Sequence, residues 1–206
     1  VEEFERILQR FPPENHFHLT LVVPYNCGTR ISETFAIDLI EDVDFQKHEL
    51  HIRRQWQKRN KTWYIKPPKY DSYRTIKMGE TLEQELKYGI HQRKLNKLKY
   101  GGAYLNTYVM PDNSITQIRA DIQVAYKEIT PLCVKDTGEL LTPDSFKYCA
   151  RVVHYELGNV LFHSHCLRHT HGTILAEAGV NPKTVMERLG HKDITTTLQT
   201  YTFNTE

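Results

Sequence analysis

The stretch LTLVVPYNCGTRISETFAI, residues 19–37, decides the fold of this chain. It is apolar on both sides of Gly28, and glycine is the residue that most often ends a helix and turns the backbone. The pattern predicts a pair of buried helices joined by a tight turn, with Arg30 at the head of the second. This placement gives Arg30 more functional weight than an ordinary surface arginine carries.

Around this stretch the sequence predicts one small sheet. Polar and apolar residues alternate at 48–56 and at 61–65 around the polar residues 58–60, which favours a hairpin. A third strand is expected at 73–78. The secondary structure of residues 103–130 is ambiguous from the sequence, and residues 132–141 resemble a second short hairpin.

Helices account for most of the remaining chain. A helix is expected over 81–99 with Thr81 as its cap, and Thr142 followed by Pro143 is a strong start for another. The last third predicts three helices: residues 165–178, residues 182–189, and a short final helix capped by Asp193 that carries Tyr201. The expected fold class is mainly α with a small antiparallel β-sheet.

Composition limits the class of protein. The chain has 206 residues, 39% hydrophobic and 25% charged, enough to bury the core of one domain or of one domain with a small subdomain. No apolar run approaches the roughly 18 residues of a membrane span, and the first residues given do not form the apolar run that is typical of a signal peptide. The four cysteines lie far apart, so we expect reduced, packed thiols. Because the chain opens at Val1 directly on an amphipathic helix, we expect a fragment of a longer protein.

Local charge is more informative than the net charge of +2. Residues 51–59 and residues 91–99 are basic and interleaved with apolar or aromatic side chains, as a surface that follows a phosphate backbone would be. A solvated protein face would have the same composition, so either interpretation stays open for each segment.

Two arginines, a lysine and two histidines in this chain have the chemistry to hold a phosphate that gains negative charge during reaction. The guanidinium group of Arg30 or Arg168 has a planar fork that can bridge two non-bridging phosphate oxygens, whereas a lysine acts as a point charge. His165 and Arg168 are three residues apart on a predicted helix, so both project from one face and can reach the same phosphate.

These residues also carry a resemblance. The stretches NCGTRISE at 26–33, HCLRHTH at 165–171 and LGH at 189–191, followed ten residues later by Tyr201, resemble the tyrosine recombinase family, specifically the integrases of phages and mobile elements. The resemblance covers the catalytic domain nearly end to end. It implies a mainly helical domain with a small antiparallel sheet, site-specific DNA cleavage, and a covalent 3′-phosphotyrosyl intermediate formed with no cofactor and no metal.

The resemblance implies a role for each matching residue. Arg30 and Arg168 would hold the scissile phosphate, His165 would accept the phenolic proton or hold the phosphate, and His191 would donate to a phosphate oxygen. The neighbouring histidines at 163, 169 and 171 are expected to be structural.

Lys69 matches the lysine that the family places in a β-hairpin, with Ser72 and Arg74 at the expected offsets. Its implied role is general acid, because the departing 5′-oxygen is a poor leaving group unless it is protonated. Lys66 is the competing candidate.

Tyr201 is the implied nucleophile. A phenol with a pKa of about 10 attacks poorly at neutral pH, so it needs a base and a cationic phosphate pocket beside it. The spacing from Gly190 and His191 to Tyr201 distinguishes it from the other tyrosines.

The expected partner is double-stranded DNA, bound by a homotetramer because two duplexes exchange strands. Residues 1–206 would be the catalytic domain without amino-terminal DNA-binding domains, so the isolated chain is expected to be a weakly binding monomer. Accessory DNA-bending or excision proteins are further expected partners. A membrane is not expected, and the expected location is the bacterial cytoplasm, at the nucleoid.

The same residues are compatible with three other functions. A type IB topoisomerase uses the same chemistry to relax supercoils as a monomer. A metal-dependent hydrolase or zinc protein could use His165 and His169, which are four residues apart, but no HExxH pattern or acidic third ligand accompanies them. A DNA-binding protein without catalysis is the third.

Overall fold

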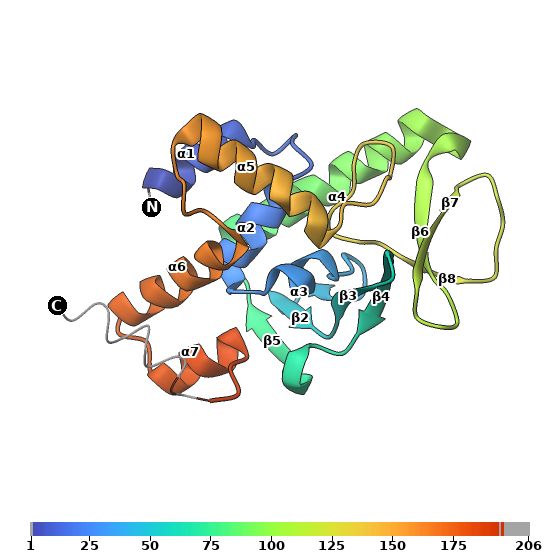
Figure 1. Ribbon diagram of the computed structural model, residues 1–206. Helices are drawn as coiled ribbons and strands as arrows, with labels where there is room; N and C mark the ends of the chain where they lie inside the picture. Colours follow the sequence, from blue (N-terminus) through green and yellow to red (C-terminus); the bar gives the residue numbers. More distant parts are fainter. Residues whose placement is uncertain (1, 194, 196–206) are drawn as a thin grey trace.

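A computed structural model of the chain describes residues 2–193 and residue 195 (Figure 1). It is about 46% helical with small antiparallel sheets, which confirms the predicted fold class. The longer helices are α1 (Glu2–Arg10), α2 (His18–Cys27), α3 (Ile31–Phe35), α4 (Glu80–Tyr100), α5 (Phe146–Leu157), α6 (Ser164–Glu177) and α7 (Pro182–Leu189). Within the described residues, no helix combines the length and the apolar character that crossing a bilayer requires.

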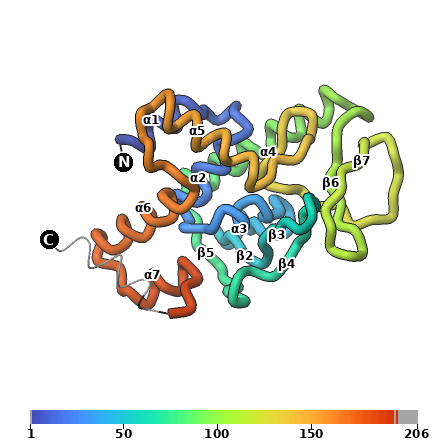
Figure 2. Tube along the Cα trace, in the orientation of Figure 1, coloured from blue at the N-terminus to red at the C-terminus, as the bar shows by residue number. Residues whose placement is uncertain are grey.

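The predicted helix pair around Gly28 forms the centre of the molecule. Helix α2 packs against α4 and α6 (Figures 1 and 2). Its Leu21, Val23 and Cys27 are fully buried. It ends at Gly28, whose φ of 65° lies in the left-handed region and whose N–H donates to the Pro24 carbonyl at 2.9 Å. Arg30 has an extended backbone and directly precedes α3. The glycine therefore sets the direction in which Arg30 leaves the core.

Among the described residues, the strands form three small sheets instead of the one sheet and the separate short hairpin at 132–141 that the sequence predicted. One sheet joins β1 (Val43–Asp44), β2 (Glu49–Ile52) and β5 (Arg74–Lys77), and a second is the hairpin of β3 (Gln55–Arg59) and β4 (Thr62–Lys66). The third has the order β7-β6-β8 and consists of β6 (Leu105–Val109), β7 (Ile115–Arg119) and β8 (Lys127–Ile129). All of the pairings are antiparallel.

The predicted hairpin is present, but its bounds were wrong. Arg59 pairs with Thr62, so the turn is made by Asn60 and Lys61, both with positive φ, as a two-residue type I′ hairpin turn requires. The segment expected as one strand at 48–56 splits after Ile52, and its first part pairs with β5 instead. An alternating pattern marks which residues face the core but does not name the partner strand.

Of the two predicted helix caps, Thr142 precedes its helix start and Thr81 does not. Helix α4 begins at Glu80 after Gly79, so Thr81 lies in the first turn and is not the cap. Thr142 does precede the predicted helix start, and a short 3₁₀ turn η3 (Pro143–Ser145) leads into α5.

The last third forms helices α6 and α7 as predicted. The Asn181 side chain accepts a hydrogen bond from the Lys183 N–H at 2.9 Å, Pro182 follows it, and Gly190 ends the helix with a φ of 67°. Helix α6 packs against α2 and α7, and α7 also contacts β5. These contacts bring residues from distant parts of the chain to one place.

Candidate functional site

One open cavity of about 520 Å³ collects most of the predicted site residues. It lies at the start of α3, along α6 and beyond the end of α7. Four predicted side chains line it: Arg30, His165, Arg168 and His191. Sequence reasoning did not anticipate the other lining residues, which are Tyr70, His169, Lys192 and Asp193.

Arg30 is held at the cavity by contacts to two elements. Its Nη1 donates to Glu33 Oε1 at 2.7 Å, and its Nη2 donates to the Gly190 carbonyl at 2.8 Å. The Glu33 carboxylate also accepts from the backbone N–H of Arg30 at 2.9 Å, which caps α3. The guanidinium is therefore oriented before any ligand binds.

Arg168 lies deeper, and its residue is 6% exposed. Its Nη1 donates to the Gly28 carbonyl at 2.7 Å, so the turn that positions Arg30 also positions Arg168. Burial, followed by the positive charge of Arg30, lowers the pKa of Arg168 to about 9. The guanidinium still carries its charge at pH 7, and a bound anion would stabilise it.

Behind the two arginines, Glu33 binds Arg30, and Arg74 in turn binds Glu33. The Glu33 side chain is fully buried and accepts from Arg74 Nη2 at 2.7 Å, while Arg74 Nε donates to the Arg188 carbonyl at 2.9 Å. Burial by itself raises the pKa of Glu33, but the hydrogen bond and charge of Arg74, with the charge of Arg30, outweigh it and lower the pKa below its usual value. The carboxylate thereby connects α3, β5 and the end of α7. Its position three residues after Arg30, one helical turn away, was the available sequence signal.

The cavity keeps its histidines neutral at neutral pH. Burial, with the charges of Arg168 and Arg30, lowers the pKa of His191 to about 4. Burial, with His169 and Arg168 as neighbours, also lowers the pKa of His165, and burial with Arg168 lowers that of His169. A neutral imidazole can accept a proton at one nitrogen and donate at the other.

His171 has a structural role, as expected. Its Nδ1 lies 2.9 Å from the Tyr25 carbonyl, and Arg188 Nε donates to its Nε2 at 3.0 Å. Because arginine can only donate, Nε2 accepts and the proton is on Nδ1. His169, for which the same structural role was expected, lines the cavity.

Lys69 is not at a hairpin tip, contrary to the prediction. It begins η1 (Lys69–Asp71), a 3₁₀ turn between β4 and β5, two strands that belong to different sheets. Lys69 is not among the residues that line the cavity, but its Nζ lies 4.8 Å from the centre of the Tyr70 ring, and Tyr70 does line it. The competing Lys66 ends β4.

Tyr201 lies outside the described residues. Just before it, Asp193 Oδ1 accepts from the N–H of Thr195 at 2.9 Å and from its hydroxyl at 2.7 Å. A helix-capping aspartate makes bonds of this kind, but the final helix that the sequence predicts after Asp193 lies outside the described residues.

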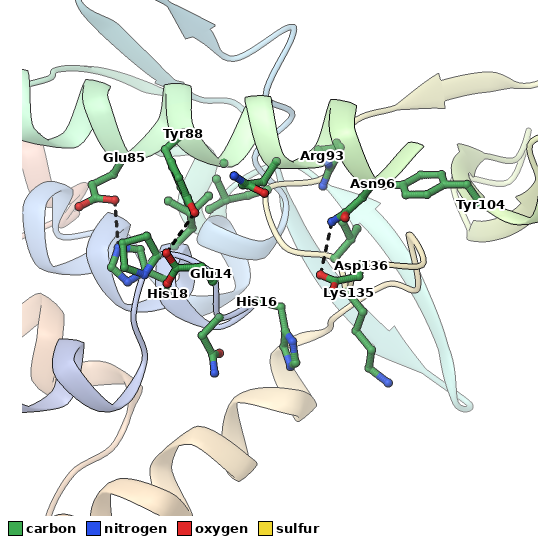
Figure 3. A pocket seen from close by; sticks show the side chains of 17 residues that line it. Glu14, His16, His18, Glu85, Tyr88, Arg93, Asn96, Tyr104, Lys135 and Asp136 are labelled. Atoms are coloured by element: carbon green, nitrogen blue, oxygen red, sulfur yellow. Dashed lines mark hydrogen bonds and ion pairs between the residues drawn. The ribbon is translucent and has the colours of Figure 1, made fainter. Parts of the chain in front are cut away.

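A second cavity, of about 180 Å³, lies on another part of the molecule, between residues 13–19, α4 and residues 132–136 (Figure 3). Its polar side chains pair with one another: His18 with Glu85 at 3.1 Å, Tyr88 with Glu14 at 3.2 Å, and Asn96 with Asp136 at 3.3 Å. None of the predicted site residues lines it.

His165 and His169 were also the basis of the zinc alternative. Their ring centres are 6.4 Å apart. Across residues 2–193 and 195, no group of three or more His, Cys, Asp or Glu side chains is arranged to hold a metal ion.

Comparisons with known proteins give one family match over the whole chain and matches to individual proteins over parts of it. Residues 1–206 fit the model of the phage integrase family. A tyrosine recombinase XerC-like protein of Caldanaerobacter subterraneus subsp. tengcongensis is 29% identical over 191 residues, which is 88% of this chain and 44% of the relative. The integrase of Staphylococcus phage L54a is 49% identical over 43 residues, 21% of this chain and 12% of that protein.

A solved structure of the Tn1549 transposon integrase in complex with transposon right end DNA has a TM-score of 0.72 at 25% identity. It matches 97% of this chain, and the match covers 58% of the solved chain, which holds residues 82–397 of that integrase. The chain thus spans about half the length of the XerC-like relative that it matches, 44% of it.

Proposed function

The chain belongs to the phage integrase family, and on that premise we propose that residues 1–206 are the catalytic domain of a site-specific DNA recombinase. It cleaves and rejoins DNA strands through a covalent 3′-phosphotyrosyl intermediate, and so integrates or excises a mobile element or prophage. The observation that carries the proposal is the convergence of Arg30, Arg168, His165 and His191 on one cavity.

The two arginines hold the scissile phosphate. Attack on phosphorus concentrates negative charge on the non-bridging oxygens, and donors already aimed at them stabilise that transition state more than the ground state. Arg30 and Arg168 are oriented by protein hydrogen bonds, so little reorganisation is needed when the phosphate binds. His191, neutral at pH 7, donates a further hydrogen bond.

The proton transfers follow from the remaining groups. The Tyr201 hydroxyl oxygen bonds to phosphorus, and its proton passes to the neutral imidazole of His165. The bond from phosphorus to the 5′-oxygen breaks, and the Lys69 ammonium gives that oxygen a proton. The phosphotyrosyl ester keeps the phosphodiester energy, so the reverse steps join a new 5′-hydroxyl without another energy source.

The proposed partner is double-stranded DNA; the Tn1549 integrase structure contains transposon right end DNA. Strand exchange between two duplexes needs four catalytic domains, so the active form is a homotetramer on DNA, whereas the isolated domain is a monomer. Accessory proteins that bend DNA would select the direction of the reaction. We expect the recombinase to act in the bacterial cytoplasm, at the nucleoid, where the DNA of a mobile element or prophage lies.

The test is capture of the covalent intermediate on a nicked duplex, from which the cleaved fragment diffuses away. In the presence of a metal chelator, the wild-type chain should become linked to one DNA strand. Tyr201→Phe should bind the same duplex with unchanged affinity and form no linked product. A Tyr201→Phe chain that still became linked would contradict the proposal.

A type IB topoisomerase would give the same adduct, so a second assay separates the two activities. The recombinase should produce recombinants between two sites on separate duplexes. Relaxation of one supercoiled plasmid without recombinants would favour the topoisomerase.

A further inference from the structure

Tyr70 has a backbone conformation that a bulky residue rarely adopts. Its φ is 61°, and that of the next residue, Asp71, is 51°. A large side chain in the left-handed region is strained unless the surroundings impose it. Core packing does not explain Tyr70, because the residue is 60% exposed.

Short local hydrogen bonds impose this turn. The Asp71 N–H donates to the Pro68 carbonyl at 3.0 Å, and the Ser72 hydroxyl donates to the Lys69 carbonyl at 2.9 Å. The turn also fits against the end of α7, since a Cβ added to Gly190 would lie 3.2 Å from Ser72 Cβ. The turn is therefore fixed relative to the residue that precedes His191.

The turn presents the Tyr70 ring to the cavity and to two ammonium groups. The Lys69 Nζ lies 4.8 Å from the ring centre and the Lys192 Nζ lies 5.8 Å from it. Tyr70 and Lys192 line the cavity, whereas Lys69 does not. Lys69 thus contacts a ring that lines the cavity, although Lys69 itself does not line it.

We propose that Tyr70 is a positioning residue that holds the Lys69 ammonium toward the leaving-group side of the scissile phosphate; this inference rests on the proposed function. A ring face attracts an ammonium within about 6 Å and carries no net charge. It can therefore orient the lysine without neutralising it, whereas a carboxylate would repel the incoming phosphate. Lys69 then gives its proton to the 5′-oxygen as the phosphorus–oxygen bond breaks, and the lysine is left as a neutral amine.

The test uses a leaving group that needs no proton. A nicked duplex, selected from a random-sequence pool by covalent capture on the wild-type chain, is made with either oxygen or sulfur at the 5′-bridging position of the cleaved bond. A thiolate leaves without protonation, so the sulfur duplex bypasses the general acid. The readout is the single-turnover rate of adduct formation by the full chain.

Tyr70→Ala should slow adduct formation on the oxygen duplex by roughly two- to fivefold, the size of an exposed cation–π contact, and should match the wild type on the sulfur duplex. Tyr70→Phe keeps the ring and should keep the wild-type rate on both duplexes. Lys69→Ala should show a larger loss on oxygen, also restored by sulfur. In the Lys69→Ala background, Tyr70→Ala should have no further effect.

Tyr73→Ala is the matched control, because Tyr73 is 56% exposed in the same segment and does not line the cavity. It should match the wild type on both duplexes. Equal slowing of Tyr70→Ala on oxygen and sulfur, or no slowing at all, would overturn the inference, as would a Lys69→Ala defect that sulfur does not restore. If the wild-type chain captures no duplex from the pool, the proposed function itself fails.

Discussion

Glu33 shows how one buried side chain organises the cavity. Its carboxylate is bound by Arg30 and Arg74, and Arg74 in turn binds the Arg188 carbonyl near the end of α7. Loss of the negative charge would leave two guanidinium groups close together in a buried place. The energetic cost of such a change is set by the charge left without a partner rather than by the bond removed.

Glu33→Gln should therefore lower the free energy of unfolding at pH 7 by about 3 kcal/mol and reduce the rate of adduct formation. Urea denaturation measures the first effect and single-turnover assays the second. Because the pKa of Glu33 is lowered in the folded state, its contribution is present above the usual pKa near 4.5 and is lost as the pH falls through the lowered value. The Gln variant should lack this loss.

Glu156→Gln provides the control for Glu33→Gln, since Glu156 forms an exposed ion pair with Arg10 at 2.6 Å. Surface pairs of this kind contribute little. An equal effect of the two substitutions would contradict the role given to Glu33.

The buried His171 should make the free energy of unfolding depend on pH. Burial, with Arg188 nearby, lowers its pKa to about 4 from an ordinary value of 6.5, and protonation would break its bond with Arg188. The unfolded chain binds the proton more readily, so stability is complete above pH 6.5 and falls as the pH drops toward 4. The expected loss is up to about 3 kcal/mol.

Thermal or urea unfolding between pH 7 and pH 4 measures this loss. His171→Gln should be less stable at pH 7 and should show a shallower decline toward acid pH. Parallel pH profiles for the wild type and the variant would show that His171 is not the group that titrates.

Chemistry at the residue scale was the part that the sequence predicted best. Arg30, His165, Arg168 and His191 meet in one cavity. Helical spacing accounts for His165 and Arg168, which share a face of α6, whereas Arg30 precedes α3 and His191 follows α7. The sequence did not predict Tyr70, since its position depends on two successive residues with positive φ. Such backbone choices have no periodic signature when neither residue is glycine.

At the scale of elements, Gly28 joins three helices. Its turn ends α2, its carbonyl binds Arg168, and side chains of α6 and α7 pack against it. A Cβ placed there would lie 2.4 Å from Leu189 Cδ2 and 2.8 Å from His171 Cδ2, in a backbone with φ of 65°.

Gly28→Ala should therefore destabilise the chain by about 3 kcal/mol or more, because overpacking adds to backbone strain. Adduct formation should fall with it, since both arginines depend on this turn. Gly158→Ala is the matched control: it also ends a helix with positive φ, at 76°, but an added Cβ meets nothing within 4 Å. That variant should lose only about 1 kcal/mol. Equal losses, measured by urea denaturation, would contradict the packing argument.

The elements themselves were predicted unevenly. Helices α6 and α7 were predicted well, because capping residues and terminal glycines are local signals. The separation of the strands into three sheets was not predicted, because pairing is decided by distant partners. The predicted position of Lys69 in a hairpin was wrong for the same reason, because β4 and β5 belong to different sheets.

At the scale of the whole molecule, much of the positive charge is already paired. In the segment 51–59, Arg54 binds Glu41 at 2.8 Å and Lys58 pairs with Asp144; in 91–99, Lys97 binds Glu128 at 3.1 Å. The cavity gathers Arg30, Arg168 and Lys192 around one space, with Glu33 paired to Arg30 and Asp193 also in the lining. That these basic segments follow DNA stays a prediction.

Salt dependence of DNA binding tests this view of the surface. Each phosphate neutralised adds about 0.9 to the slope of log affinity against log salt concentration. Lys192→Gln should reduce the slope by about one, whereas Lys97→Gln, which removes a paired charge on α4, should leave it unchanged. A fluorescence anisotropy titration at several salt concentrations measures both slopes. A lower slope for Lys97→Gln would instead place α4 against the phosphate backbone.

The measurement that tests the central claim most directly is the identity of the residue that becomes bonded to DNA. The adduct formed on a nicked duplex is digested with nuclease and protease, and the modified peptide is sequenced by mass spectrometry. We predict one nucleotide joined through its 3′-phosphate to Tyr201. Attachment to another residue, attachment through a 5′-phosphate, or cleavage without any protein-linked strand would contradict the account.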